Sequence, residues 1–463
     1  MAKYQKYAEY QDSGIEWLGE IPSHWFNTKV KYEAYVKARV GWHGLKSDDF
    51  TDEGPYLVTG SDFKGTNIDW SQCYHCDEPR YEQDPYIQLR DGDLLITKDG
   101  TIGKVALVSN LKNGEKATLN SGIFVVRPLR NNFSTKFYFW LLQSKVFKEF
   151  VDFNKTGSTI VHLYQDTFVN FEYASPNLKD QIQIANFLDY ETAQIDSLIA
   201  KQEKLIELLK EKRQAVISHV VTKGLNPDIA MKDSGVEWLG QVPEHWIVKP
   251  NKYLLDFVTS GSRGWAQYYA DTGSLFFRIA NLTRDTIEPK LESLQFVEPP
   301  KGSEGERSKI KIGDLLISIT ADLGSVCVAD SAIQNGYVSQ HVALCRPQKK
   351  YDSRWLAYYI LSDSAKEQLL GSGYGGTKIQ LSLEDIKELI IVVPPKDEQI
   401  LIANYIDEKL NQFEYLIKQA NNLVTILQER RTALISSAVT GKIDVRHWQN
   451  PNKNNDAKSE LGA

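Results

Sequence analysis

Cys73, His75 and Cys76 stand close together in the sequence, and their residue types are the ligands that zinc prefers. A structural zinc site needs four ligands, which are usually supplied by two spaced pairs. The other two cysteines, Cys327 and Cys345, lie in separate apolar runs typical of strands, and the second half of the chain has no counterpart of the motif. We therefore expect no metal site in this chain.

Two other patterns could serve enzymatic chemistry, but each lacks its required context. The glycines of Gly371–Gly376 have the spacing of a dinucleotide-binding loop, yet they follow a predicted helix instead of opening one. Asp271, Glu288 and Lys290 could form the carboxylate–lysine set of a nuclease, but the first half has no such set. The sequence contains no P-loop and no Asn-Pro-Pro-aromatic motif of adenine methyltransferases. These observations predict a non-catalytic chain without a cofactor of its own.

Polar residues in loops could serve a different chemistry, which is contact with a nucleic acid. Arg, Lys, Asn and Gln read base edges, whereas basic and small polar groups hold phosphates. Each such residue could equally be a solvated surface group, and each tryptophan among them a packing residue. In the first half the candidate DNA contacts are Arg39, Trp42, His43, Lys46, Ser61, Lys64, Lys98, Lys104 and Ser158. In the second half they are Ser262, Arg263, Trp265, Arg278, Asn281, Thr283, Arg284, Thr377 and Lys378.

The composition is that of an ordinary globular protein. Of the 463 residues, 42% are hydrophobic and 25% are charged, and this length suggests two or three domains. The formal net charge of −6 argues mildly against nucleic acid, although an acidic chain can still carry a local basic face. Because the chain has few cysteines, no signal peptide and no run of about 18 apolar residues, we expect a cytoplasmic protein without a membrane span.

The elements that must position these residues come from a sequence that repeats itself. DSGIEWLGEIPSHW at 12–25 returns as DSGVEWLGQVPEHW at 233–246, an offset of 221 residues. GDLLI at 92–96 returns at 313–317 with the same offset, and later matches follow in the same order. We infer an internal duplication, because chance similarity would not preserve both order and spacing.

Each half begins with a β-rich part, at 12–175 and at 233–394. Short apolar runs broken by Gly, Asn and Asp predict a curved, mostly antiparallel sheet in each of these parts. Each part also carries one predicted amphipathic helix, at 134–150 and at 353–370.

Each half ends with a long predicted helix, at 177–222 and at 396–440. Apolar residues spaced alternately by three and four positions form the seam of a coiled coil in both helices. The residues that we expect to pair the helices are Leu188, Ile195, Leu198, Leu209, Val216, Ile406, Phe413, Leu416, Leu427 and Leu434. An antiparallel pair within the chain would bury both seams and place the β-rich parts at opposite ends of a rod of about 60 Å. A homodimeric coiled coil is the alternative.

Several of these segments resemble the specificity subunit of type I restriction-modification enzymes. The repeated opening segment, GDLLITKDGTIGKVALV at 92–108, and the loops GSTIVHL at 157–163 and GGTKIQLSLEDI at 375–386 are similar to blocks of that family. The helix openings PNLKDQIQIANFLD at 176–189 and PPKDEQILIANYID at 394–407 match its helix-opening pattern, except that Asn177 replaces a second proline. The resemblance covers essentially the whole chain.

The resemblance implies an α+β fold with two β-rich target-recognition domains separated by two long antiparallel coiled-coil helices, in an internal pseudo-two-fold repeat. The implied parts are recognition domain 1 at 1–175, spacer helix 1 at 176–222, a linker at 223–232, recognition domain 2 at 233–394, spacer helix 2 at 395–441 and a polar tail at 442–463. Because the loops at 36–50 and 257–271 differ, the two recognition domains should read different sequences.

The resemblance also implies the function and the partners. Each recognition domain would read half of a bipartite, asymmetric site in double-stranded DNA, and the helices would set the spacing between the halves. Two methyltransferase subunits would dock on the helices, and motor-nuclease subunits would complete the complex. S-adenosylmethionine, ATP and Mg would enter with these partners. A stand-alone nuclease or methyltransferase and a coiled-coil scaffold that binds no DNA remain as alternatives.

Overall fold

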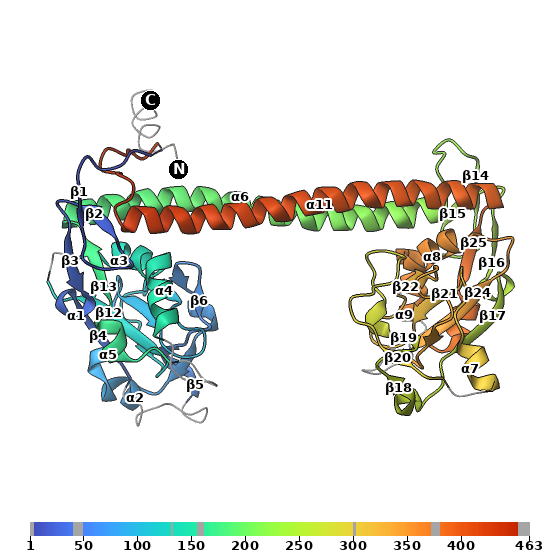
Figure 1. The fold of residues 1–463 in the computed structure, drawn as a ribbon, viewed down its shortest axis with the longest axis horizontal. Coiled ribbons are helices and arrows are strands. Elements are labelled where there is room, and N and C mark those ends of the chain that lie inside the picture. The colour runs from blue at the N-terminus through green and yellow to red at the C-terminus, as the bar shows by residue number, and fades with distance from the viewer. Residues whose placement is uncertain are drawn as a thin grey trace. The chain divides into compact units, whose positions relative to one another are not determined.

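The computed structural model describes residues 4–39, 50–130, 133–154, 162–299, 302–371 and 380–451. The chain divides into two compact units, of which unit 1 is Met1–Lys201 with Leu423–Ala463 and unit 2 is Gln202–Asn422. Each unit therefore contains one β-rich part and a portion of both long helices (Figure 1). None of the helices in the described ranges is long and apolar enough to cross a membrane.

A four-stranded antiparallel sheet forms the centre of unit 1. Its order is β10-β9-β12-β4, with bounds β4 Ala34–Ala38, β9 Leu94–Thr97, β10 Val105–Leu107 and β12 Ile123–Pro128. Alternate residues of β9 point to opposite faces, so Leu94 and Ile96 enter the main core whereas Leu95 enters a smaller one. Because both faces are covered, the strand is apolar throughout and not alternating.

Helices cover one face of this sheet and a second small sheet covers the other (Figure 1). The helices are α3 Thr135–Leu141, α4 Lys145–Phe153 and α5 Gln165–Val169. The small sheet has the order β11-β5-β8, with bounds β5 Phe50–Val58, β8 Tyr74–Cys76 and β11 Ala117–Leu119. Strand β11 runs parallel to β5, whereas the other described strand pairs of unit 1 are antiparallel.

Unit 2 has the same two-sheet arrangement. Its central sheet has the order β17-β24-β21-β22, with bounds β17 Leu255–Ser260, β21 Leu315–Ser318, β22 Val326–Val328 and β24 Val342–Pro347. Its small sheet has the order β18-β20-β19-β23, with bounds β18 Tyr269–Ala270, β19 Ser274–Phe277, β20 Phe296–Val297 and β23 Tyr337–Val338. Again one pair, β19 with β23, is parallel.

The remaining elements are short. In unit 1 they are β1 Tyr10–Asp12, β2 Glu20–Pro22, β3 Phe26–Lys29, α1 Val30–Glu33, β6 Phe63–Lys64, β7 Asn67–Ile68, α2 Glu78–Gln83 and β13 Glu172–Ser175. In unit 2 they are β14 Met231–Asp233, β15 Gln241–Pro243, β16 Ile247–Pro250, α7 Ser303–Ser308, α8 Ser353–Leu361, α9 Asp363–Gly371, α10 Leu383–Glu388 and β25 Ile390–Val393.

Both predicted amphipathic helices are broken into two. Ser144 follows the end of α3 and caps α4, where its hydroxyl accepts a hydrogen bond from the Phe147 amide. Ser362 acts in the same way between α8 and α9, where its hydroxyl accepts from the Ala365 amide at 3.3 Å. A serine hydroxyl competes with the helical backbone for hydrogen bonds, so it starts a new helix in place of extending the old one.

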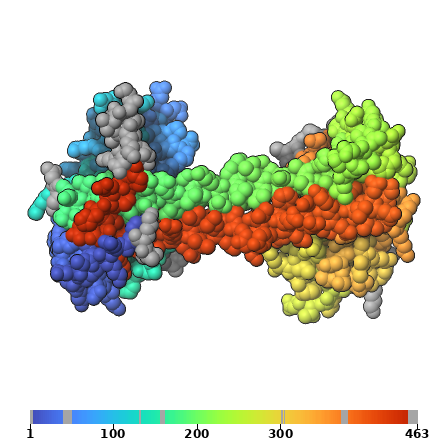
Figure 2. Space-filling view, turned by 90° about the horizontal axis from the view of Figure 1, so that it is seen from above, coloured from blue at the N-terminus to red at the C-terminus, as the bar shows by residue number. Residues whose placement is uncertain are grey.

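The long helices are α6 Leu178–Lys223 and α11 Lys396–Val439, close to the predicted bounds. Both end before a glycine with a left-handed backbone, Gly224 at φ +80° and Gly441 at φ +73°. A side chain at Gly441 would collide with Pro22 of the opening segment, so this helix end packs directly on β2. The segment after α11 continues along the N-terminal residues of unit 1 (Figure 2), where the Asp444 amide donates to the Gln5 carbonyl.

Within each unit, the first part of one long helix lies beside the last part of the other. In unit 1, Ile195 of α6 shares a core with Leu427 and Leu434 of α11, and the Arg431 Nε donates to Asp196 at 2.8 Å. In unit 2, Ile217 of α6 shares a core with Ile406 of α11. The two helical portions within a unit therefore run in opposite directions.

The seam differs from its prediction at the intermediate positions. Leu198 and Leu416 are 46% and 47% exposed, whereas their neighbours Ile199 and Ile417 are half-buried. In an α-helix, positions three and four residues ahead lie on the same face, and the sequence offered an apolar residue at both. Ile199 packs against the core that contains Leu427 and Leu434 of the other helix. The exposure of Leu198 and Leu416 contradicts the prediction that they pair the helices. Of the other expected pairing residues, Leu188, Ile195, Ile406, Phe413, Leu427 and Leu434 are buried, and Leu209 and Val216 are half-buried.

Candidate nucleic-acid interface

In each unit, two loops begin where the parallel strands of the small sheet end. In unit 1 the loop after β5 begins at Thr59, and the loop after β11 begins at Asn120. In unit 2 the loops after β19 and β23 begin at Arg278 and Ser339. Because parallel strands end at the same edge, both loops of a unit lie next to each other.

The first of these loops has the same turn in both units. In unit 1 the Thr59 amide donates to the Asp62 carboxylate at 2.7 Å, and the Asp62 amide returns to the Thr59 carbonyl at 3.2 Å. In unit 2 the Arg278 amide donates to the Asn281 side-chain oxygen at 3.0 Å, and the Asn281 amide returns at 2.9 Å. Thr59 and Arg278 thus occupy corresponding positions.

The second loop also corresponds between the units. The Asn120 amide donates to the Val58 carbonyl at 3.0 Å, and the Ser339 amide donates to the Phe277 carbonyl at 2.8 Å. Asn120 and Ser339 therefore start equivalent loops with different side chains. The two units share a backbone frame at this edge and differ in the polar groups that the frame presents.

Asn281 is interior, which corrects its assignment as a DNA contact. Its side chain is fully buried and donates to the carbonyls of Lys290 and Ser293 at 2.9 and 3.0 Å. The side chain therefore fixes the loop from inside and has no surface to offer to DNA.

Arg39 is also interior and is corrected for the same reason. It is 3% exposed, and its guanidinium bonds the Asp84 carboxylate at 2.9 Å, the Leu119 carbonyl at 2.9 Å and the Thr118 hydroxyl at 3.1 Å. Asp84 is distant in sequence, so no local pattern marked Arg39 as half of a buried ion pair.

Unit 2 contains a cleft of about 290 Å³ at the edge where its two loops meet. Ser262, Trp265 and Arg278, all predicted from the sequence, line this cleft. Trp265 is almost fully buried and stacks on Phe276 with ring centroids 5.8 Å apart, so it is a packing residue that forms a wall. Ser339, Gln340 and His341 also line the cleft, and sequence reasoning missed them. They directly follow the two-residue strand β23, and only its parallel pairing with β19 reveals that they lie beside Arg278.

Unit 1 contains a larger cavity of about 680 Å³ on the side of α4. The loop Gly100–Lys104 and the Phe63 ring line it together with Lys148 of α4. The exposed Lys104, predicted as a DNA contact, therefore lies at this cavity with a second cation.

Three other predicted cations are paired with carboxylates. Lys64 bonds Asp69, Lys98 bonds Asp99 at 2.8 Å, and Arg284 bonds Asp322 at 2.6 Å. Partial burial opposes ionisation of Asp99, but the hydrogen bonds from Lys98 and His162 outweigh it and lower the pKa of this carboxyl. These pairs lie at or near the surface, and a phosphate could compete with the carboxylates for the same cations.

The remaining predicted residues divide into exposed, partly exposed and undescribed ones. Arg263 is exposed and Ser262 and Thr283 are half-buried, while the exposed Ser61 bonds the Thr59 hydroxyl at 2.6 Å. Trp42, His43, Lys46, Ser158, Thr377 and Lys378 lie outside the described residues.

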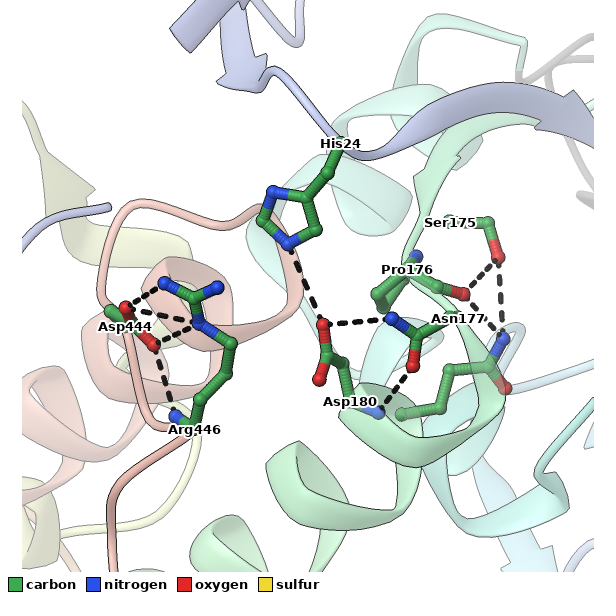
Figure 3. A network of polar contacts seen from close by, with 8 residues as sticks. His24, Ser175, Pro176, Asn177, Asp180, Asp444 and Arg446 are labelled. Atoms are coloured by element: carbon green, nitrogen blue, oxygen red, sulfur yellow. Dashed lines mark hydrogen bonds and ion pairs between the residues drawn. The ribbon is translucent and has the colours of Figure 1, made fainter. Parts of the chain in front are cut away.

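A network of polar residues at the start of α6 has a structural role (Figure 3). Asn177 caps the helix by accepting from the Asp180 amide at 3.0 Å, and His24 of the opening segment lies 3.5 Å from the Asp180 carboxylate. Gln181 donates to the Pro176 carbonyl at 3.0 Å and accepts from the Ser134 amide at 2.9 Å. These contacts join the opening segment, the strand end and α3 to the long helix.

The corresponding residues of unit 2 form the same connections. His245 and Trp246 of the opening segment bond the Glu398 carboxylate at 2.6 and 2.9 Å. Gln399 donates to the Pro394 carbonyl and accepts from the Asp352 amide, each at 2.8 Å. The shared acid–glutamine pair therefore attaches each long helix to its own β-rich part.

The cysteines do not form a metal site among the described residues, where no group of three or more His, Cys, Asp or Glu side chains could hold an ion. Burial raises the pKa of the Cys76 thiol to about 11 and of the Cys345 thiol to about 12. Cys73 is also buried, and its thiol donates to the Asp69 carbonyl at 3.5 Å.

Comparison with known proteins relates this chain to one family. The sequence model of the type I restriction modification DNA specificity domain matches residues 45–208 and 301–425. The specificity subunit of the type I restriction enzyme EcoBI from Escherichia coli is 23% identical over 371 residues, which cover 78% of this chain and 75% of the relative. The putative MjaX specificity subunit from Methanocaldococcus jannaschii is 24% identical over 442 residues, which cover 93% and 96%.

Two solved structures share the fold. One comes from work on complex assembly and conformational transition of the type I R-M system, with a TM-score of 0.70 and 18% identity, covering 91% of this chain and 99% of that one. The other is the HsdS subunit from Thermoanaerobacter tengcongensis, with a TM-score of 0.51 and 17% identity, covering 91% and 98%.

Proposed function

Because this chain belongs to the type I restriction modification DNA specificity family and is a non-catalytic specificity subunit, we propose that its two units read the two halves of a bipartite, asymmetric DNA site. The observation that carries this proposal is the shared edge of the small sheet. Both units present two loops there on the same hydrogen-bonded frame, but with different side chains. A common frame with different polar groups is what two readers of different sequences require.

We propose the exposed and partly exposed polar residues near these edges as the DNA contacts. They are Ser61, Lys64, Lys98, Lys104, Ser262, Arg263, Arg278, Thr283 and Arg284. Trp42, His43, Lys46, Ser158, Thr377 and Lys378 are proposed on their sequence alone. Local cations of this kind can bind phosphates even though the whole chain carries a net charge of −6.

We propose that α6 and α11 form one antiparallel coiled coil that sets the spacing between the half-sites in an internal pseudo-two-fold repeat. The opposite chain directions within each unit and the repeat of the acid–glutamine connection support this arrangement. The proposed recognition domains are 1–175 and 233–394, and the proposed spacer helices are 176–222 and 395–441. Residues 223–232 form the linker between the repeats, and residues 442–463 the C-terminal tail.

We propose that two methyltransferase subunits dock on these helices. Large apolar side chains are exposed at positions that repeat with an offset of 218 residues, namely Leu198, Leu205 and Leu208 on α6 and Leu416, Leu423 and Ile426 on α11. Exposed apolar side chains in such a row mark an interaction surface. The partners would supply S-adenosylmethionine, and motor-nuclease subunits would supply the ATP and Mg chemistry.

Mapping of methylated bases tests the proposed function. Host DNA is sequenced with native base modifications in cells that carry the partner subunits, with and without this chain. We expect a bipartite methylated motif that appears only with the chain. An unchanged methylation pattern would overturn the proposal, and methyl transfer by the purified chain alone would favour a stand-alone enzyme.

A further inference from the structure

The cleft of unit 2 contains two buried polar atoms that have no hydrogen-bond partner among the residues that the structure describes. They are the Arg278 Nε and the Ser339 Oγ, and both residues line the same cleft. Ser339 is 5% exposed, so its hydroxyl is held inside the fold. A buried polar group without a partner is costly, and such groups persist where a ligand supplies the missing bond. This pair of atoms therefore points to a ligand that enters the cleft.

The Arg278 guanidinium remains available to that ligand. Its hydrogen bond to the Ser293 hydroxyl is long, at 3.5 Å, and it forms no ion pair within the described part of the chain. By contrast, Arg284 is neutralised by Asp322 and Arg346 by Asp314. The cleft therefore contains a guanidinium whose positive charge is not paired with a carboxylate of the described residues.

The walls of the cleft favour a flat group over a phosphate. Trp265 and Phe276 supply aromatic surface, and Gln340 and His341 add polar groups that can bond a base edge. A phosphate could be held by exposed charge alone, and Arg263, on the loop that carries Trp265, offers such a charge. Two donors recessed among aromatic rings instead require a ligand with acceptors on a protruding planar edge.

We propose that Arg278, supported by Ser339, reads a guanine in the half-site of unit 2. An arginine fork matches the O6 and N7 acceptors that guanine presents in the major groove, and no other base offers this pair. The corresponding positions of unit 1 carry Thr59 and Asn120, which have no such fork, so this reading belongs to unit 2 alone. The inference rests on the proposed DNA-reading function and assigns one base pair within it.

Methylation mapping with the complete complex tests the inference through matched variants. We expect Arg278→Ala to relax one G·C position by about tenfold or more in one half-site, while the other half-site stays strictly read. Ser339→Ala should relax the same position more weakly and should not lower the melting temperature, since it removes an unpartnered hydroxyl. Arg263→Ala is the control with the same change of charge, and it should weaken methylation without altering the motif. Asn120→Ala should relax a position in the opposite half-site.

The outcomes separate this inference from the proposed function. If the wild-type complex yields no bipartite motif, the proposed function fails. If it does, an unchanged motif with Arg278→Ala, a relaxed A·T pair, or relaxation in the half-site that Asn120→Ala affects overturns the guanine assignment alone. If Arg278→Ala abolishes methylation, the motif cannot be mapped from methylated bases. The base preference of the complex is then measured by competition binding to DNA duplexes that differ at one position each. Loss of preference at one G·C pair then supports the inference, and an unchanged preference contradicts it.

Discussion

At the scale of single residues, two arginines at the ends of strands have opposite roles. Arg39 follows β4 and is enclosed by Asp84, Thr118 and the Leu119 carbonyl, so it stabilises the small sheet of unit 1. Arg278 follows β19 and faces a cleft without a carboxylate partner in the described part of the chain. Residue type alone did not distinguish them, because what surrounds each guanidinium comes from distant segments.

Removing the Arg39 side chain should destabilise unit 1. Arg39→Ala removes one side of the buried Arg39–Asp84 ion pair, a change that typically costs about 3–5 kcal/mol. Thermal unfolding of the full chain should show a lower melting temperature. Lys64→Ala, which breaks an exposed pair, is the control and should leave the melting temperature nearly unchanged. Equal losses in both variants would contradict the structural role of Arg39.

The thiols should be inert in the folded chain. At pH 8 a thiol whose pKa is about 11, such as Cys76, is ionised in only about one molecule in a thousand, and the thiolate is the reactive form. We expect the native protein to resist iodoacetamide and to react fully after denaturation, as measured by intact mass. Rapid labelling of Cys76 in the native state, or retention of zinc after dialysis against a chelator, would argue against this description.

At the scale of elements, the long helices show how a correct period can still give a wrong contact. The seven-residue repeat through Leu188 and Ile195 identified the buried side of α6. Three and four residues after Ile195 the sequence has two apolar residues, Leu198 and Ile199, and Ile199 is the one that packs against the core shared with the partner helix. Leu198 and Leu416 remain exposed, and they belong to the row of apolar side chains on which we propose that the methyltransferase subunits dock.

A charge at neighbouring positions of α6 should separate folding from assembly. Ile199→Asp places a carboxylate against the core of unit 1 and should lower the free energy of unfolding by about 1–3 kcal/mol. Leu198→Asp should leave the melting temperature almost unchanged and weaken binding of the methyltransferase subunit, measured by titration with that subunit. The reverse pattern would show that the predicted seam was right after all.

At the scale of the whole molecule, the proposed coiled coil makes a geometric prediction. Inserting four residues, about one helical turn, into both α6 and α11 should lengthen the gap of the methylated motif. The two half-sites themselves should stay unchanged, because the insertions leave both cleft-bearing units intact. Inserting four residues into α6 alone is the control and should disturb the pairing. A methylated motif with its original gap in the double-insertion variant would exclude a spacing role for the helices.

The sequence by itself determined the family, the long helices and the α+β composition of the two β-rich parts. Repeated blocks and apolar periods are local patterns, and they persist in the sequence because they depend on nearby residues and on the periods of helix and strand. The opening segments and the acid–glutamine pairs were also visible, although their role in attaching each helix to its β-rich part was not.

Only the tertiary structure decided which polar residues face a cleft. The parallel pairing of β19 with β23 joins Arg278 to Ser339, Gln340 and His341, which are some sixty residues away in the sequence. Arg39 is enclosed through Asp84, which is also distant in the sequence, and Asn281 is enclosed by the nearby carbonyls of Lys290 and Ser293. Burial and hydrogen-bond partners are set by segments that meet only after folding, so the candidate site could be placed in loops from the sequence but not resolved within them.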